Sequence, residues 1–279
     1  PGFFLPVEQE LARALANRRA RGVGGGPLVR RAAGLGAAML AVLLVISAAG
    51  FVPARDELFH GENLLALSLM ASLVGYFGAH LARGTLSGNG RFGPYGVIFG
   101  VEGVSRLAGC VVLAVAGVKS VGPYGLLVAV APFAAIAIAL PRQRGLVTPG
   151  PDAPWSELST RMSLLLAGSV LTQSLVNAAP LTVAVLAGSD EKEVVGRFMA
   201  GVLIARVPLF MFQAVQAALL PKLAGLAGAG RYADFRSGLL RLLTVVIAIG
   251  GAGTLGAFTV GPWALRTFFN PDFELGRGD

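Results

Sequence analysis

Three charged residues stand in otherwise apolar stretches of this sequence. Glu102 and Arg106 lie four residues apart in the run 93–118, acidic residue first, which is the favourable order for an ion pair on a helix face. Arg206 stands alone in the run 198–221. A charge at the centre of a membrane helix costs about 2.5–3.5 kcal/mol on insertion scales, so such residues usually face a partner or a hydrated cavity. The pattern predicts either a cavity that binds an anionic group or, for Glu102 and Arg106, an ion pair that fixes helix packing.

Uncharged polar side chains follow the same helical spacing. Tyr95 shares a face with Glu102, and Gln213 shares one with Arg206. Two further stripes recur every four residues: Ser68, Ser72, Tyr76 and His80, and then Ser169, Gln173 and Asn177. Such stripes also join membrane helices without any transport role. Because several helices each carry one polar face, we expect a hydrated cavity lined by Tyr95, Ser72, Tyr76, Gln173, Asn177 and Gln213.

The helices that would position these residues are indicated by seven apolar runs, each about long enough to cross a bilayer. The runs are residues 32–54, 63–79, 93–118, 120–141, 162–189, 198–221 and 242–265. Backbone polar groups in lipid must be satisfied internally, so the runs predict an all-α integral membrane protein, a polytopic helical bundle. With 54% hydrophobic and 14% charged residues, the chain carries too few charges to cover a soluble fold of 279 residues.

The loop charges predict the orientation of these helices. Most of the 23 Lys and Arg residues, Arg83 among them, fall in alternate loops, which the positive-inside rule places in the cytoplasm. Topology therefore accounts for the net charge of +8, and no nucleic-acid partner is predicted. We expect Glu8, Glu10 and Arg13, at the end of a partial first helix, to be solvated or paired near the lipid headgroups.

The longest cytoplasmic linker, residues 141–160, divides the chain into two parts. Residues 1–140 hold the partial helix and four spans, and residues 161–279 begin a second part with three spans. The linker contains the turn-forming Pro149-Gly150-Pro151, so it is expected to act as a hinge. The chain begins without methionine and is expected to be a fragment of a longer protein.

No group of residues indicates catalysis or metal binding. There is one cysteine, Cys110, and there are two histidines. Gly88-Asn89-Gly90-Arg91-Phe92-Gly93 matches a dinucleotide-binding pattern but follows no strand, so it is interpreted as a turn before a helix. The sequence therefore predicts no enzyme and no cofactor, apart from a coupling ion, H⁺ or Na⁺.

Three segments resemble bacterial polysaccharide-biosynthesis membrane proteins of the multidrug/oligosaccharidyl-lipid/polysaccharide exporter superfamily. They are F-L-P-V-E-Q-E-L-A-R at residues 4–13, Y-G-V-I-F-G-V-E-G-V-S-R at residues 95–106, and the stretch from Ala205 to Pro221. They are similar to the second, fifth and eighth helices of that superfamily. The resemblance implies a fragment of a two-lobe transporter of about 12 to 14 helices that works by alternating access.

The resemblance also implies a substrate and a location. The substrate would be a lipid-linked oligosaccharide or polysaccharide precursor, moved across the bacterial inner membrane. Arg106 and Arg206 would bind its pyrophosphate, since Arg is a strong bidentate phosphate ligand. Glu102 would be a coupling residue, and membrane lipids and polysaccharide-assembly enzymes would be partners. The alternatives are a cation-coupled multidrug exporter, a membrane glycosyltransferase or ligase, and a scaffold without transport.

Overall fold

The computed structural model describes residues 2–54, 62–159, 162–186, 195–196, 198–199, 201–202, 206 and 231–268. These residues form α-helices and, within the described part of the chain, no β-strand. Five of the described helices are long and apolar enough to cross a membrane. The prediction of an all-α membrane protein is confirmed at this level.

Most of the predicted spans coincide with helices. The helices are α1 (Leu5–Ala20), α2 (Gly26–Ala54), α3 (Asn63–Gly88), α4 (Phe92–Val115), α5 (Val121–Ala139), α6 (Ser156–Ser159), α7 (Met162–Leu186) and α10 (Tyr232–Phe268). The five candidate spans lie in α2, α3, α4, α5 and α10, and α7 covers most of the predicted run 162–189. The run 198–221 lies mostly outside the described residues.

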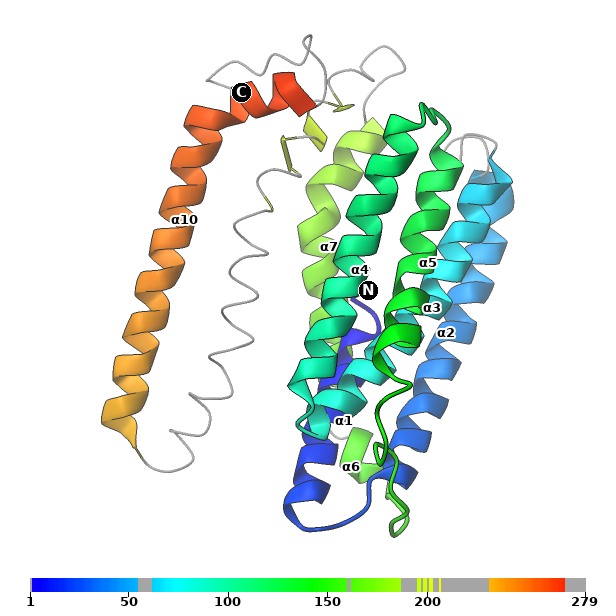
Figure 1. Ribbon diagram of the computed structural model, residues 1–279, viewed down its shortest axis with the longest axis vertical. Helices are drawn as coiled ribbons and strands as arrows, with labels where there is room; N and C mark the ends of the chain where they lie inside the picture. The colour runs from blue at the N-terminus through cyan, green and yellow to red at the C-terminus, as the bar shows by residue number, and fades with distance from the viewer. Residues whose placement is uncertain are drawn as a thin grey trace. The chain divides into compact units, whose positions relative to one another are not determined.

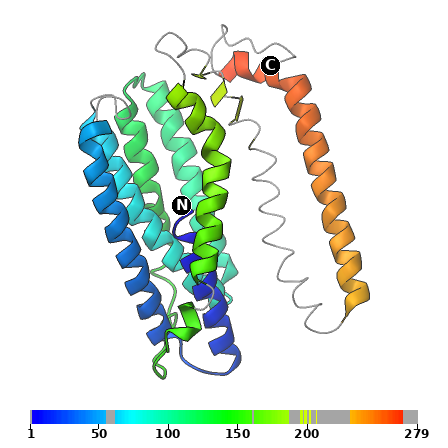
Figure 2. The ribbon, with the colours of Figure 1, turned by 180° about the vertical axis from the view of Figure 1, so that it is seen from behind.

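The chain divides into two compact units, residues 1–174 (unit 1) and residues 175–279 (unit 2), with the boundary inside α7. In unit 1, α2, α3, α5 and α4 run side by side (Figure 1), an arrangement also visible from behind (Figure 2). Helix α3 contacts α1, α2, α4 and α5 and is therefore the central helix of this unit. Unit 2 holds the end of α7 and the long helix α10.

Glycines on α3 let its neighbours come close. A Cβ added at Gly75 would lie 2.9 Å from the Phe133 ring of α5. A Cβ at Gly84 would lie 2.8 Å from the Glu8 carbonyl oxygen of α1, and one at Gly88 would lie 2.9 Å from the Ala12 carbonyl oxygen. Small residues four apart are the usual means of close helix packing in membranes. Gly84 and Gly88 therefore bring α1 directly against the backbone of α3.

The turn after α3 ends that helix in a defined way. Gly90 has φ of 73°, and the Arg91 N–H donates to the Leu86 carbonyl oxygen at 2.8 Å, the long bond of a Schellman motif. The Asn89 side-chain amide donates to the carbonyl oxygens of Thr85 (2.8 Å) and Leu146 (3.3 Å). The glycine pattern at residues 88–93 is thus a helix-ending turn, as interpreted from the sequence.

Within unit 1, Arg18 of α1 binds several residues of the linker at residues 141–159. This side chain is 2% exposed and donates from Nε and Nη2 to both carboxylate oxygens of Glu157, at 2.7 and 3.0 Å. Its remaining N–H groups donate to the carbonyl oxygens of Gly24, Pro151 and Asp152, at 3.0–3.1 Å. Arg18 therefore ties these linker residues to α1 by binding carbonyl groups of the turn-rich sequence, and the hinge role stays a prediction.

The ion pair between Arg18 and Glu157 should make the contact between the linker and α1 sensitive to acid. The hydrogen bonds from Arg18 hold the pKa of the Glu157 carboxyl below its ordinary value, against a smaller opposing effect of burial. Because this pKa is lowered, the ion pair contributes its full stabilisation of the linker contact above the ordinary pKa range of glutamate. The contribution is lost as the pH falls through the lowered pKa of Glu157.

This loss can be followed by Trp155, whose ring lies 5.2 Å from the Arg31 guanidinium. With Trp263 and any tryptophan outside these 279 residues replaced by Phe, Trp155 alone reports on the linker. Its fluorescence should stay constant as the pH falls from 7 to the ordinary pKa of a glutamate and should change only below it. A Glu157→Gln variant should show no such transition. A transition of equal size in that variant would exclude Glu157 as its source.

Candidate functional site

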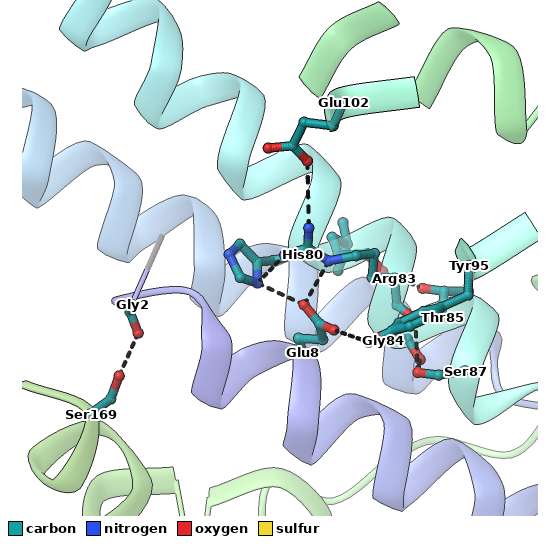
Figure 3. Close-up of polar contacts among 11 residues, drawn as sticks. Gly2, Glu8, His80, Arg83, Gly84, Thr85, Ser87, Tyr95, Glu102 and Ser169 are labelled. Carbon is teal, nitrogen blue, oxygen red and sulfur yellow. Dashed lines mark hydrogen bonds and ion pairs between the residues drawn. The ribbon is translucent and has the colours of Figure 1, made fainter. Parts of the chain in front are cut away.

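A cluster of ionisable side chains lies between α1, α3 and α4 in unit 1 (Figure 3). We name it the central charge cluster: Glu8 from α1; Tyr76, His80 and Arg83 from α3; and Tyr95, Glu102 and Arg106 from α4. Glu8, His80, Arg83 and Glu102 are at most 7% exposed. Unpaired charges at such burial would be very costly, so their pairing decides the character of the site.

Arg83 joins the two carboxylates of the central charge cluster. Its Nε donates to Glu8 Oε2 at 3.0 Å, and its Nη1 lies 3.7 Å from Glu102 Oε2. The guanidinium also lies 4.5 Å from the centre of the Phe99 ring. Arg83 was expected to be a loop charge, but α3 continues through it to Gly88 and buries it. Arg83 is therefore a bridge between α1 and α4.

Glu8 occupies the centre of the same contacts. Its Oε2 lies 2.7 Å from His80 Nδ1, and its Oε1 lies 3.4 Å from the Tyr95 hydroxyl. Of the two expected arrangements for Glu8, solvated or paired, the side chain is paired: it is 6% exposed and its carboxylate binds Arg83. The reason is the close approach of α1 to α3 at Gly84, which carries Glu8 among the side chains of α3.

The ion pair between Glu102 and Arg106, predicted from their spacing, is present. Arg106 also donates to the Tyr76 hydroxyl at 2.5 Å, and its side chain is 30% exposed. Two carboxylates and two guanidinium groups thus meet in the central charge cluster. Their formal charges cancel when His80 is neutral, so Arg106 is not an isolated cation in this arrangement.

Arg206 is placed differently. It belongs to unit 2, where its Nη2 donates to the Val176 carbonyl oxygen at 2.9 Å and to Asn177 Oδ1 at 3.3 Å. Both acceptors are neutral, and no described residue supplies a carboxylate to Arg206. The structure therefore brings Arg206 together with Asn177, another predicted cavity residue, and leaves the positive charge uncompensated within the described residues.

The other predicted cavity residues fall into three groups. Tyr76 and Tyr95 belong to the central charge cluster, and Ser72 is half-buried one helical turn before Tyr76. Gln173 is a half-buried residue of α7, and its side chain lies close to Gly2. Gln213 lies outside the described residues. Among the described residues, no three His, Cys, Asp or Glu side chains are grouped to hold a metal ion.

The sequence interpretation missed Glu8 and Arg83 as members of the site and gave His80 no role of its own. A signal for them existed, because Tyr76, His80 and Arg83 recur at the spacing of one helix face. Glu8 stands between apolar positions that become buried, Val7 and Leu11. Extending the helix beyond the apolar run 63–79 would have placed His80 and Arg83 on the same helix as Tyr76.

The comparisons with known proteins give relatives of undescribed function. No protein-family model and no solved structure matches the chain. Two proteins of Mycobacterium tuberculosis, uncharacterized protein Rv1510 and uncharacterized protein MT1558/MT1560, are each 30% identical to it over 256 residues. The match covers 86% of this chain and 55% of each relative. The chain thus spans about half the length of the curated relatives it matches.

Proposed function

We propose that the chain is part of a two-lobe membrane transporter that flips or exports a lipid-linked oligosaccharide or polysaccharide precursor. Transport would cross a bacterial cytoplasmic membrane by alternating access, in a fold of about 12 to 14 helices, with no bond made or broken. The proposal is supported by buried ionisable groups on helices long enough to span a membrane. Such residues in spanning helices commonly mark substrate or ion pathways.

One observation favours an anionic substrate, namely the position of Arg206. The two Glu and two Arg residues of the central charge cluster neutralise one another, whereas Arg206 has only neutral partners among the described residues. A guanidinium whose described partners are neutral suits a phosphate oxygen, because a charge-assisted hydrogen bond is stronger than a neutral one. Arg206 would bind the pyrophosphate while the lipid tail stays in the bilayer.

Replacement of Arg206 tests this role. The complete gene product that contains these residues is reconstituted in liposomes with a polyprenyl-pyrophosphate-linked oligosaccharide, and leaflet exchange is measured. Arg206→Gln should lower the initial rate about tenfold or more, the effect of losing a charged hydrogen bond worth about 1.5–3 kcal/mol. Arg206→Lys, which keeps the charge, should retain more of the rate than Arg206→Gln.

A matched control is Arg231→Gln, which removes a cation from an exposed ion pair with Asp234 on α10. This variant should flip the lipid at the wild-type rate. A wild-type rate for Arg206→Gln would contradict the proposed phosphate contact.

The same liposomes distinguish the multidrug-exporter alternative. A cationic drug would favour free carboxylates, but Glu8 and Glu102 are both paired with arginines. Export of a cationic drug that is unaffected by Arg206→Gln, without movement of the lipid-linked sugar, would favour that alternative.

A further inference from the structure

One nitrogen of His80 contacts two groups of opposite hydrogen-bonding character. His80 Nδ1 lies 2.7 Å from Glu8 Oε2 and 2.9 Å from Arg83 Nη2. A protonated ring nitrogen donates to the carboxylate, and a bare one accepts from the guanidinium. Nδ1 can make only one of these hydrogen bonds at a time, so which one forms depends on whether Nδ1 carries a hydrogen. Figure 3 shows the three side chains converging from α1 and α3.

We propose that Glu8 of α1 and His80 of α3 form a proton-binding site where these two helices meet in unit 1. In the proton-free state, the ring carries its hydrogen on Nε2, and Nδ1 accepts from Arg83 Nη2. In the proton-bound state, Nδ1 carries the added proton and donates to Glu8 Oε2. Arg83 keeps its Nε contact with Glu8 and its approach to Glu102 in both states. The proton thus exchanges one hydrogen bond for another without breaking the helix packing.

Within the central charge cluster, we assign the added proton to His80. The groups around it are Glu8 from α1, Tyr76 and Arg83 from α3, and Tyr95, Glu102 and Arg106 from α4. The ionisable groups of the other helices packed on α3 have contacts elsewhere or lie at a helix end: Arg30 and Arg31 on α2, the latter paired with Asp152, and Tyr124 on α5, which donates to Val118. Histidine alone among these types ordinarily changes charge between pH 5 and 8.

The second ring nitrogen suggests how the proton reaches the site. His80 Nε2 is buried and has no hydrogen-bond partner among the described residues. The imidazole ring lies near the rings of Phe4 and Tyr76. Buried polar groups without a protein partner are commonly satisfied by ordered water. Water at Nε2 would connect the imidazole to a proton source without any change in the Glu8 and Arg83 contacts.

The bound proton would change how unit 1 attracts an anion. The charges of Glu8, Glu102, Arg83 and Arg106 cancel, so the proton makes the central charge cluster positive. An anionic substrate and the proton should then favour each other's binding, since coupling between two ligands is reciprocal. This last step rests on the proposed function and names H⁺ as the coupling ion, whereas the proton-binding site itself does not depend on it.

The site can be observed directly because the chain has only two histidines. A His60→Gln variant of the complete gene product, with nitrogen-15 in histidine, reports on His80 alone if its other histidines are likewise replaced. Between pH 5 and 9, the Nδ1 signal should move from the protonated to the bare form. Glu8→Gln should shift the pH midpoint of this His80 transition by about one unit or more, because the imidazole loses a charged partner. Thr244→Val, which removes an exposed hydroxyl that donates to the Leu240 carbonyl oxygen on α10, should leave the midpoint unchanged.

The proposal is overturned if Nδ1 keeps one form throughout this range, or if Glu8→Gln leaves the midpoint unchanged. The measurement needs no substrate, so it is independent of the proposed transport. A full titration in the Arg206→Gln variant, together with lost lipid flipping, would support both inferences. A titration without any lipid flipping in the wild type would keep the proton-binding site and remove the proposed function.

Discussion

Replacement of Glu8 by leucine should lower the free energy of unfolding of unit 1 by about 3–5 kcal/mol, the usual cost of leaving a buried charge without its partner. Glu8 is 6% exposed, and its carboxylate binds Arg83 at 3.0 Å while contacting His80 at 2.7 Å. Without it, the carboxylate left near Arg83 among the described residues is that of Glu102, at the longer distance of 3.7 Å. The loss is measured by denaturant unfolding in detergent, monitored by circular dichroism.

The double variant Glu8→Leu with Arg83→Leu separates a charge effect from a packing effect. Replacing both partners of a buried ion pair with apolar residues is often nearly neutral, so the double variant should be more stable than either single variant. Asp234→Leu is the control for removing a carboxylate from an exposed pair and should cost less than about 1 kcal/mol. Strictly additive losses in the double variant would show that Glu8 and Arg83 do not act as a pair.

Replacement of Arg18 by methionine should release the linker at residues 141–159 from its contacts with α1. The change removes the hydrogen bonds to Gly24, Pro151, Asp152 and Glu157 and leaves the Glu157 carboxylate without its closest cation. If the change lowers the free energy of opening the linker by about 3 kcal/mol, the population of the open form should rise about 100-fold, since 1.4 kcal/mol is a factor of ten. Trypsin cleavage after Arg142 and Arg144 should accelerate accordingly, because cleavage follows the population of the open form.

The neighbouring residue provides the control for this experiment. The Arg19 side chain is exposed and makes no hydrogen bond or ion pair with any described residue. Arg19→Met therefore removes the same charge one position away and should leave the cleavage rate of the linker unchanged. Equally accelerated cleavage in both variants would mean that overall charge, and not the contacts of Arg18, keeps the linker in place.

The helices themselves could be predicted from the sequence, because the apolar runs are long and lack charges. The ion pair between Glu102 and Arg106 could also be predicted, since both residues lie on one helix at a fixed spacing. Local patterns of this kind depend on one element only and need no knowledge of how helices pack.

The contacts between elements could not be predicted in the same way. Arg18 and Glu157 are separated by a long stretch of sequence, and their pairing depends on how the linker folds back onto α1. Glu8 and Arg83 looked like charges at the ends of apolar runs, which is why they were assigned to headgroups and loops. Gly84 and Gly88 carry the missing information, because the absence of side chains there decides that α1 packs against α3.

The most direct test of the proposed function is leaflet exchange by the complete wild-type protein in liposomes. A lipid-linked oligosaccharide that carries pyrophosphate and a matched neutral glycolipid are each placed in one leaflet, and their appearance in the other is followed. We predict protein-dependent movement of the pyrophosphate lipid and little movement of the neutral one. Rates equal to those of protein-free liposomes for both lipids would contradict the account.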